Sequence, residues 1–217
     1  MGLDRGAREI FPPFLTAAIL LAFLIAVNRG LHLDGFMDFC DGLFGGFSRE
    51  RRLEIMRDSS VGAFGVAGAA GLLLLKYGAL VSLLTVPEHG KELSLLLFPM
   101  VSRWAMVVVI GAFPYVRSDG LGSPFHRERA RLATMVAAVT ALSAAVLLGS
   151  IGGAGLLLGI SLLAWLFGRW VVSQLGGLTG DIYGAANEVA EVTALVAAVA
   201  LVPHGWMEPL PQLLGGI

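Results

Sequence analysis

The amino-acid sequence predicts an all-α fold, a polytopic membrane bundle of about six transmembrane helices that forms a single domain over residues 1–217. Hydrophobic residues make up 56% of the chain, and the mean hydropathy is +0.79. Only 14% of the residues are charged, against roughly 25% in soluble domains. The apolar residues also fall into runs that approach the roughly 20 residues needed to cross a hydrocarbon core.

Six apolar runs follow one another along the chain, and each predicts one helix. The first begins at two prolines, Pro12 and Pro13, which a helix tolerates at its start. The fourth and fifth are joined by a glycine turn, Gly149 to Gly153, and the sequence leaves room for extra short interfacial or re-entrant helices. The six runs cover residues 13–28, 61–86, 93–113, 132–148, 155–172 and 189–202.

The arginines between these runs predict the orientation, because short cytoplasmic loops carry an excess of Lys and Arg. With six spans, three polar segments fall on one side of the membrane, and two of them are rich in arginine. That side is predicted to face the cytoplasm. The net charge of −1 gives no basic field that would indicate nucleic acid. The three segments cover residues 30–60, 114–131 and 174–191.

The segment after the first run carries three regularly spaced aspartates, Asp34, Asp38 and Asp41. In a helix, spacings of four and three place them on one face, where they repel one another unless a cation lies between them. Oxygen ligands suit a hard ion, so the pattern favours Mg²⁺, with Mn²⁺ as the other choice. A solvated acidic face is the alternative, which the interleaved apolar residues disfavour. His32 precedes the aspartates as a candidate general base or as a histidine that only forms a hydrogen bond.

A second acidic set lies near the start of the last run. Its members are Asp181, Glu188 and Glu191. Asp181 and Glu188 are seven residues apart, again on one helical face, and Thr179 and Asn187 add neutral ligands. Two carboxylate sets on the same side of the membrane could hold metal from opposite walls. Two metal ions held in this way stabilise the attacking and leaving oxygens in phosphoryl transfer. For Glu188, a charged helix start favoured by the helix dipole is the simpler alternative.

Three arginines are candidates for phosphate binding, because a guanidinium group forms a bidentate fork with phosphate. Arg57 lies beside Asp58 just before the second run. Its alternative role is only to mark the cytoplasmic side, as basic residues in short loops do. Arg103 lies in the middle of an apolar run, so we expect it to face the bundle interior with a partner. Arg169 lies near a helix end, where reaching toward the membrane surface is the alternative.

Several long segments resemble the signature of the cobalamin synthase (adenosylcobinamide-GDP ribazoletransferase) family. The resemblance covers roughly residues 12–202, and family members usually carry a further segment before the first helix. The matching stretches are GLHLDGFMDFCDGLFGG, RRLEIMRDSSVGAFG, SRW at 102–104, YVRSDGLGSPF at 115–125, GRW at 168–170 and GGLTGDIYGAANEVAEV at 176–192.

The resemblance implies a Mg²⁺-dependent enzyme of the last step of cobalamin assembly, in the cytoplasmic (inner) membrane of a bacterium or archaeon. Such enzymes join adenosylcobinamide-GDP to α-ribazole, or to its 5′-phosphate, and release GMP. The implied metal ligands are Asp34, Asp38, Asp41, Asp58, Asp181 and Glu188. The implied substrate and phosphate contacts are Arg57, Arg103, Arg169, Thr179 and Asn187. The implied catalytic residues are Asp34, Asp38, Asp41 and His32.

Two other classes of protein stay open on the sequence. The aspartate pattern loosely resembles the CDP-alcohol phosphotransferases, although the full spacing of their motif is missing. An ion or solute transporter is the other alternative, because intramembrane charge also marks transport pathways. The spacing of Gly62, Gly65 and Gly68 fits close helix packing, either inside one chain or between the subunits of a homo-oligomer.

Overall fold

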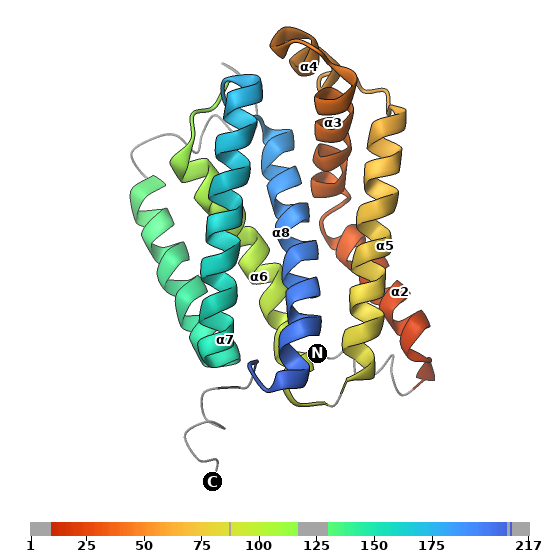
Figure 1. Cartoon of the computed structure of the whole chain (residues 1–217), viewed down its shortest axis with the longest axis vertical. Coiled ribbons are helices and arrows are strands. Elements are labelled where there is room, and N and C mark those ends of the chain that lie inside the picture. The colour runs from red at the N-terminus through yellow and green to blue at the C-terminus, as the bar shows by residue number, and fades with distance from the viewer. Residues whose placement is uncertain (1–9, 87, 117–129, 208, 210–217) are drawn as a thin grey trace.

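The computed structural model describes residues 10–86, 88–116, 130–207 and 209, and it confirms the all-α membrane bundle (Figure 1). Within this part of the chain, the only β contact is an isolated bridge between Tyr115 and Leu178. The helices are α2 (Pro13–Val27), α3 (Leu31–Gly45), α4 (Arg49–Ile55), α5 (Ala63–Thr85), α6 (Glu88–Ala112), α7 (Ala130–Leu175) and α8 (Gly180–Leu201), followed by the 3-10 turn η2 (Val202–His204).

All six predicted apolar runs are helical, but the helices cross the bundle differently from the prediction. Four helices are long and apolar enough to span a membrane, and the bent pair α2 and α3 makes a fifth candidate. Helix α2 has 15 residues, or about 22 Å at 1.5 Å per residue, which is shorter than the roughly 30 Å hydrocarbon core. The first run is therefore too short to span the core as one straight helix, and with α3 it forms either a broken span or a re-entrant loop.

Helix α7 contains the glycine turn that joins the fourth and fifth predicted runs. The backbone at Ser150 is non-helical, with φ 53° and ψ −134°. Figure 1 shows that the chain reverses direction there, so the two halves of α7 lie antiparallel. The predicted pair of helices is thus present as a hairpin.

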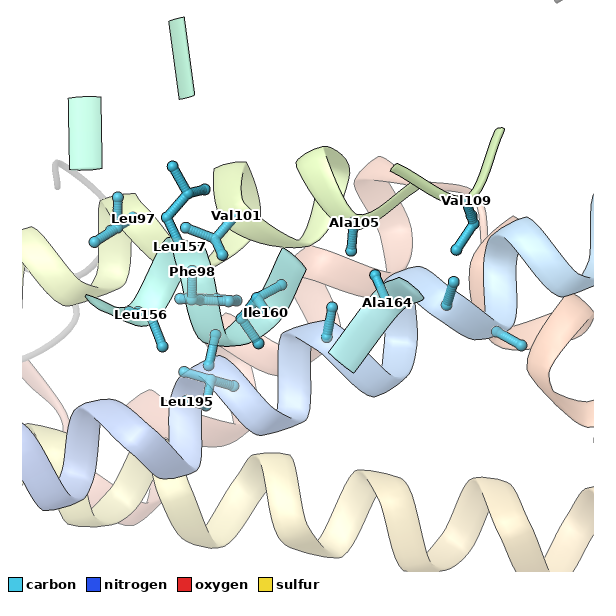
Figure 2. Packing of buried hydrophobic residues seen from close by; sticks show 14 of the residues in the cluster. Leu97, Phe98, Val101, Ala105, Val109, Leu156, Leu157, Ile160, Ala164 and Leu195 are labelled. Atoms are coloured by element: carbon cyan, nitrogen blue, oxygen red, sulfur yellow. The ribbon is translucent and has the colours of Figure 1, made fainter. Parts of the chain in front are cut away.

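Helix α8 lies at the centre of the bundle and packs against α3, α5, α6 and α7. Its buried face is rich in alanine, including Ala186, Ala190 and Ala194, and small residues let neighbouring helices approach closely. Figure 2 shows the apolar core that α8 shares with α6 and α7. The labelled residues of that core include Leu97, Phe98, Val101, Leu156, Ile160 and Leu195.

The outer surface of the bundle is apolar, as a lipid-facing surface requires. Large exposed side chains include Leu74 at 71% exposure on α5, Leu132 at 70% and Ile151 at 87% on α7. A soluble monomer rarely exposes so much contiguous apolar surface. Together with the spanning helices, this supports a multi-pass membrane protein.

One end of the bundle gathers the predicted polar segments. The α3–α4–α5 connection, the end of α6 and the α7–α8 connection all lie there (Figure 1). Two backbone hydrogen bonds join the last two: Val116 N donates to Leu178 O at 2.9 Å, and Leu178 N donates to Pro114 O at 2.8 Å. Residues 117–129 of the predicted segment 114–131, which include most of the YVRSDGLGSPF stretch, lie outside the described residues.

Candidate active site

The three aspartates of the first motif lie on one face of α3, as the sequence predicts. At 3.6 residues per turn, Asp34, Asp38 and Asp41 fall within about 60° of one another. Their burial increases along the helix: Asp34 is exposed, Asp38 is half-buried and Asp41 is buried. Asp34 and Asp38 are thus the members of this face that are not buried inside the bundle.

Asp41 is already engaged, because it caps the start of α5. Its Oδ2 accepts a hydrogen bond from Gly62 N at 2.7 Å, and its Oδ1 accepts one from Gly65 N at 2.8 Å. A carboxylate at a helix N-terminus satisfies free amides and interacts favourably with the helix dipole. The structure therefore gives Asp41 a capping role that the sequence analysis did not assign.

The same contact explains the glycine stripe of α5. A side chain at Gly62 or Gly65 would collide with the Asp41 carboxylate, and one at Gly68 would lie 2.7 Å from Cys40 Sγ. All three glycines thus face α3 inside one chain. Of the two roles that the sequence left open for this stripe, the structure favours internal packing.

The first acidic motif meets the second where α3 crosses the start of α8. A Cβ atom on Gly35 would lie 2.8 Å from the carbonyl oxygen of Asp181, and one on Gly184 would lie 3.0 Å from that of His32. The two backbones are therefore in direct contact. The crossing therefore brings two distant parts of the sequence, which carry Asp34 and Asp181, into backbone contact.

Thr179 builds the α8 side of this crossing. It is the N-cap of α8, and its hydroxyl accepts a hydrogen bond from Ile182 N at 3.4 Å. The same hydroxyl donates to Asp181 Oδ2 at 3.2 Å. We name Asp34, Asp38 and Asp181 the acid wall. Thr179 supports this wall through Asp181 and is itself fully buried.

Other predicted site residues belong to a separate set of paired charges, which we name the buried charge network: Lys76, Arg103, Glu188 and Glu191. Arg103 is its partly exposed member, with 37% of its side chain accessible. Lys76 Nζ lies 2.5 Å from Glu188 Oε2 and 2.5 Å from Glu191 Oε2. Arg103 Nη1 lies 2.6 Å from Glu191 Oε1. The expectation that Arg103 faces the interior with a partner is confirmed, and Glu188 is paired with a lysine.

Two neutral amides extend this network. Arg103 Nη1 donates to Asn187 Oδ1 at 3.0 Å, and Arg103 Nη2 donates to Asn28 Oδ1 at 2.8 Å. Sequence reasoning left Lys76 and Asn28 out of the site, and it included Glu191 only as a member of the second acidic set. The available signal was Lys76 itself, since a charge inside an apolar run marks a buried partner.

The remaining candidates lie outside both groups. Arg57 and Asp58 are exposed in the α4–α5 connection. The Ser60 hydroxyl and its backbone N–H, which lies 2.9 Å from Asp58 Oδ1, hold the pKa of the Asp58 carboxyl below its usual value. Arg169 is exposed on α7, with its guanidinium carbon 5.8 Å from the centre of the Trp165 ring.

The acid wall has the ligand chemistry of a hard cation, since it offers only oxygen donors. In the described part of the chain, no group of three or more His, Cys, Asp or Glu side chains is placed so that it could hold a metal ion. The Gly35–Asp181 contact brings the backbones that carry Asp34 and Asp181 together, and a metal at this crossing stays a prediction.

Comparison with known proteins places these features in context. A model of the family described as cobalamin-5-phosphate synthase matches residues 1–199. The adenosylcobinamide-GDP ribazoletransferase of Desulfitobacterium hafniense strain Y51 is 41% identical over 195 residues, which cover 88% of this chain and 76% of that protein. The protein of the same name from Syntrophobacter fumaroxidans is 41% identical over 203 residues, covering 91% and 79%. No solved structure matches the chain.

Proposed function

Because this chain belongs to the cobalamin-5-phosphate synthase family, we propose that it joins adenosylcobinamide-GDP to α-ribazole, or to α-ribazole 5′-phosphate, and releases GMP. The product is adenosylcobalamin or its 5′-phosphate. The relatives named for this transferase activity supply the reaction class. The observation that carries the proposal for this chain is the Gly35–Asp181 crossing, which unites the two acidic motifs.

The reaction is a phosphoryl transfer without a covalent enzyme intermediate. A ribose hydroxyl oxygen of α-ribazole forms a new bond to the phosphorus that carries the cobinamide. The bond from that phosphorus to the bridging oxygen breaks, and GMP leaves with that oxygen. The hydroxyl proton is released, and negative charge develops on the leaving GMP. Catalysis of this kind depends on positioning and on stabilisation of developing charge.

The acid wall would hold Mg²⁺, through Asp34, Asp38 and Asp181. When bound, the ion would neutralise charge on the pyrophosphate. The attacking hydroxyl proton passes to a carboxylate of this wall rather than to His32. The reason is that His32 lines a small internal cavity with Lys76, Glu188 and Glu191, whose volume of about 10 Å³ leaves no room for a substrate. Arg57 is exposed at the same end of the bundle and contacts a substrate phosphate.

This end of the bundle faces the cytoplasm of a bacterial or archaeal inner membrane in our proposal. The α3–α4–α5 connection there carries four arginines: Arg49, Arg51, Arg52 and Arg57. The opposite end has Lys91 and, at the α7 turn, no basic residue. Such a difference is typical of cytoplasmic and external loops.

The test is GMP release from adenosylcobinamide-GDP and α-ribazole by the purified protein in detergent, with and without Mg²⁺. We expect Mg²⁺-dependent release that Asp38→Ala abolishes. Glu54→Ala is the matched control, because Glu54 is an exposed carboxylate on α4 that pairs only with Arg51 among the described contacts. Release that is equal with and without Mg²⁺, or equal in both variants, would contradict the proposal.

A further inference from the structure

We propose that Asn28 and Arg103 are positioning residues. They clamp the break between α2 and α3, and they thereby set the position of the α3 carboxylates of the acid wall relative to Asp181 on α8. This inference rests on the proposed function, because it concerns the same carboxylates. It assigns Arg103 a different task from the phosphate contact that the sequence suggests. The argument begins with the break itself.

Helices α2 and α3 meet at 87° across only three residues, Asn28, Arg29 and Gly30. Arg29 has φ 53° and Gly30 has φ 70°, so two successive residues are left-handed. A residue with a Cβ atom, such as Arg29, keeps this conformation only where its surroundings enforce it. The bend therefore needs contacts that hold it. On the α2 side, Asn28 is fixed to the last turn of α2, because its Nδ2 donates to Leu24 O at 2.9 Å.

Arg103 forms a hydrogen bond with the oxygen of the Asn28 amide. Its Nη2 donates to Asn28 Oδ1 at 2.8 Å, while its Nη1 donates to Glu191 Oε1 at 2.6 Å. The planar guanidinium group thus fixes the end of α2 relative to α8 in one rigid fork. Glu191 is held in turn by Lys76 of α5. Residues from α2, α5, α6 and α8 therefore meet at the point where α3 begins.

The surroundings of this clamp exclude a substrate on its inner side. The cavity beside Asn28 has a volume of about 10 Å³, which is room for one water molecule. The charges of the network also balance, with Lys76 and Arg103 facing Glu188 and Glu191. On its outer side Arg103 borders an apolar groove between α6 and α7, but both terminal nitrogens of its guanidinium are bonded inward.

The clamp can affect the acid wall because the two are close in the chain. Asp34 lies six residues after Asn28, and its neighbour Gly35 is already in contact with Asp181. A shift of the break therefore changes the distance between the α3 carboxylates, Asp34 and Asp38, and the α8 carboxylate, Asp181. A misplacement of about 1 Å in a reacting site can reduce the rate by about 100-fold.

The decisive variant is Asn28→Ala, because both polar atoms of the Asn28 amide are already bonded within the protein, to Leu24 O and to Arg103 Nη2. We expect kcat to fall by about 10- to 100-fold, while KM for each substrate changes by less than about threefold. Asn28→Asp keeps the acceptor for Arg103, so it should recover part of the lost kcat. Ser161→Ala is the matched control. It removes an interhelical hydrogen bond of the next α6 residue, Trp104 Nε1 to Ser161 Oγ at 2.8 Å, which does not lead to α3.

A distance measurement tests the clamp without using activity. Spin labels at Leu31→Cys on α3 and Val196→Cys on α8, in a Cys40→Ala background, report the position of the start of α3 by electron resonance. Both labelled positions are exposed. We expect Asn28→Ala to broaden or shift the distance distribution, and Ser161→Ala to leave it unchanged.

Two results would overturn the inference. One is that Asn28→Ala matches Ser161→Ala in kcat and in the distance distribution. The other is that Arg103→Lys raises KM for adenosylcobinamide-GDP while Asn28→Ala has no effect, which would make Arg103 a substrate contact. An inactive wild-type protein would instead refute the proposed function, and the distance measurement would still decide on the clamp.

Discussion

Removal of the Lys76 charge should strongly destabilise the protein. The Lys76 side chain is 4% exposed, and those of its partners Glu188 and Glu191 are 7% and 2% exposed. Lys76→Met would leave two buried carboxylates with Arg103 as their one cationic partner among the described residues. Loss of one partner from a buried ion pair costs about 3–5 kcal/mol. For a chain of this length, that corresponds to a fall in Tm of about 6–20 °C.

The assay is thermal unfolding of the purified protein in one detergent, with Lys76→Met compared with Lys76→Met/Glu188→Gln. The double variant restores the balance of one cation and one anion, so it should recover most of the lost Tm. This recovery separates charge imbalance from a simple packing defect. A double variant as unstable as Lys76→Met, or a single variant with unchanged Tm, would refute the electrostatic reasoning.

Two further predictions concern the contacts of α3. Gly35→Ala should reduce kcat and lower the free energy of unfolding by about 1–3 kcal/mol, because the new Cβ would lie 2.8 Å from Asp181 O. Gly71→Ala on α5 is the control, because a Cβ there would meet no atom within 4 Å, and it should keep activity and Tm. If the two glycine variants behave alike, close packing of α3 on α8 is not required. Asp41→Ala should cost about 0.5–2 kcal/mol by removing the cap of α5, measured as a lower Tm, with less loss in Asp41→Asn. An unchanged Tm would show that the cap contributes nothing.

The sequence predicts the helices well because their length and composition are local properties. Each apolar run corresponds to a helix, and the break at Ser150 falls in the predicted glycine turn. The one-sided face of Asp34, Asp38 and Asp41 follows from the helical period alone. These features need no knowledge of which helices are neighbours.

The pairing of helices could not be predicted in this way. Lys76 and Glu188 are 112 residues apart in the chain, and no periodic pattern in the sequence connects them. The bend at Asn28 also depends on Arg103 from another helix, so the sequence indicates only a helix end there. Likewise, the capping of α5 by Asp41 requires that α3 lie beside α5, which local spacing does not determine.

The predicted carboxylates differ in whether protein groups already compensate their negative charge. Glu188 and Glu191 pair with lysine and arginine in the bundle interior, and both oxygens of Asp41 accept backbone amides. Those three are compensated by the fold itself. Asp34 is exposed on the same face of α3, in the part of the molecule where α3 crosses the start of α8. Because the fold compensates Asp41 and Glu188, our proposal assigns the metal to the acid wall and not to all six predicted carboxylates.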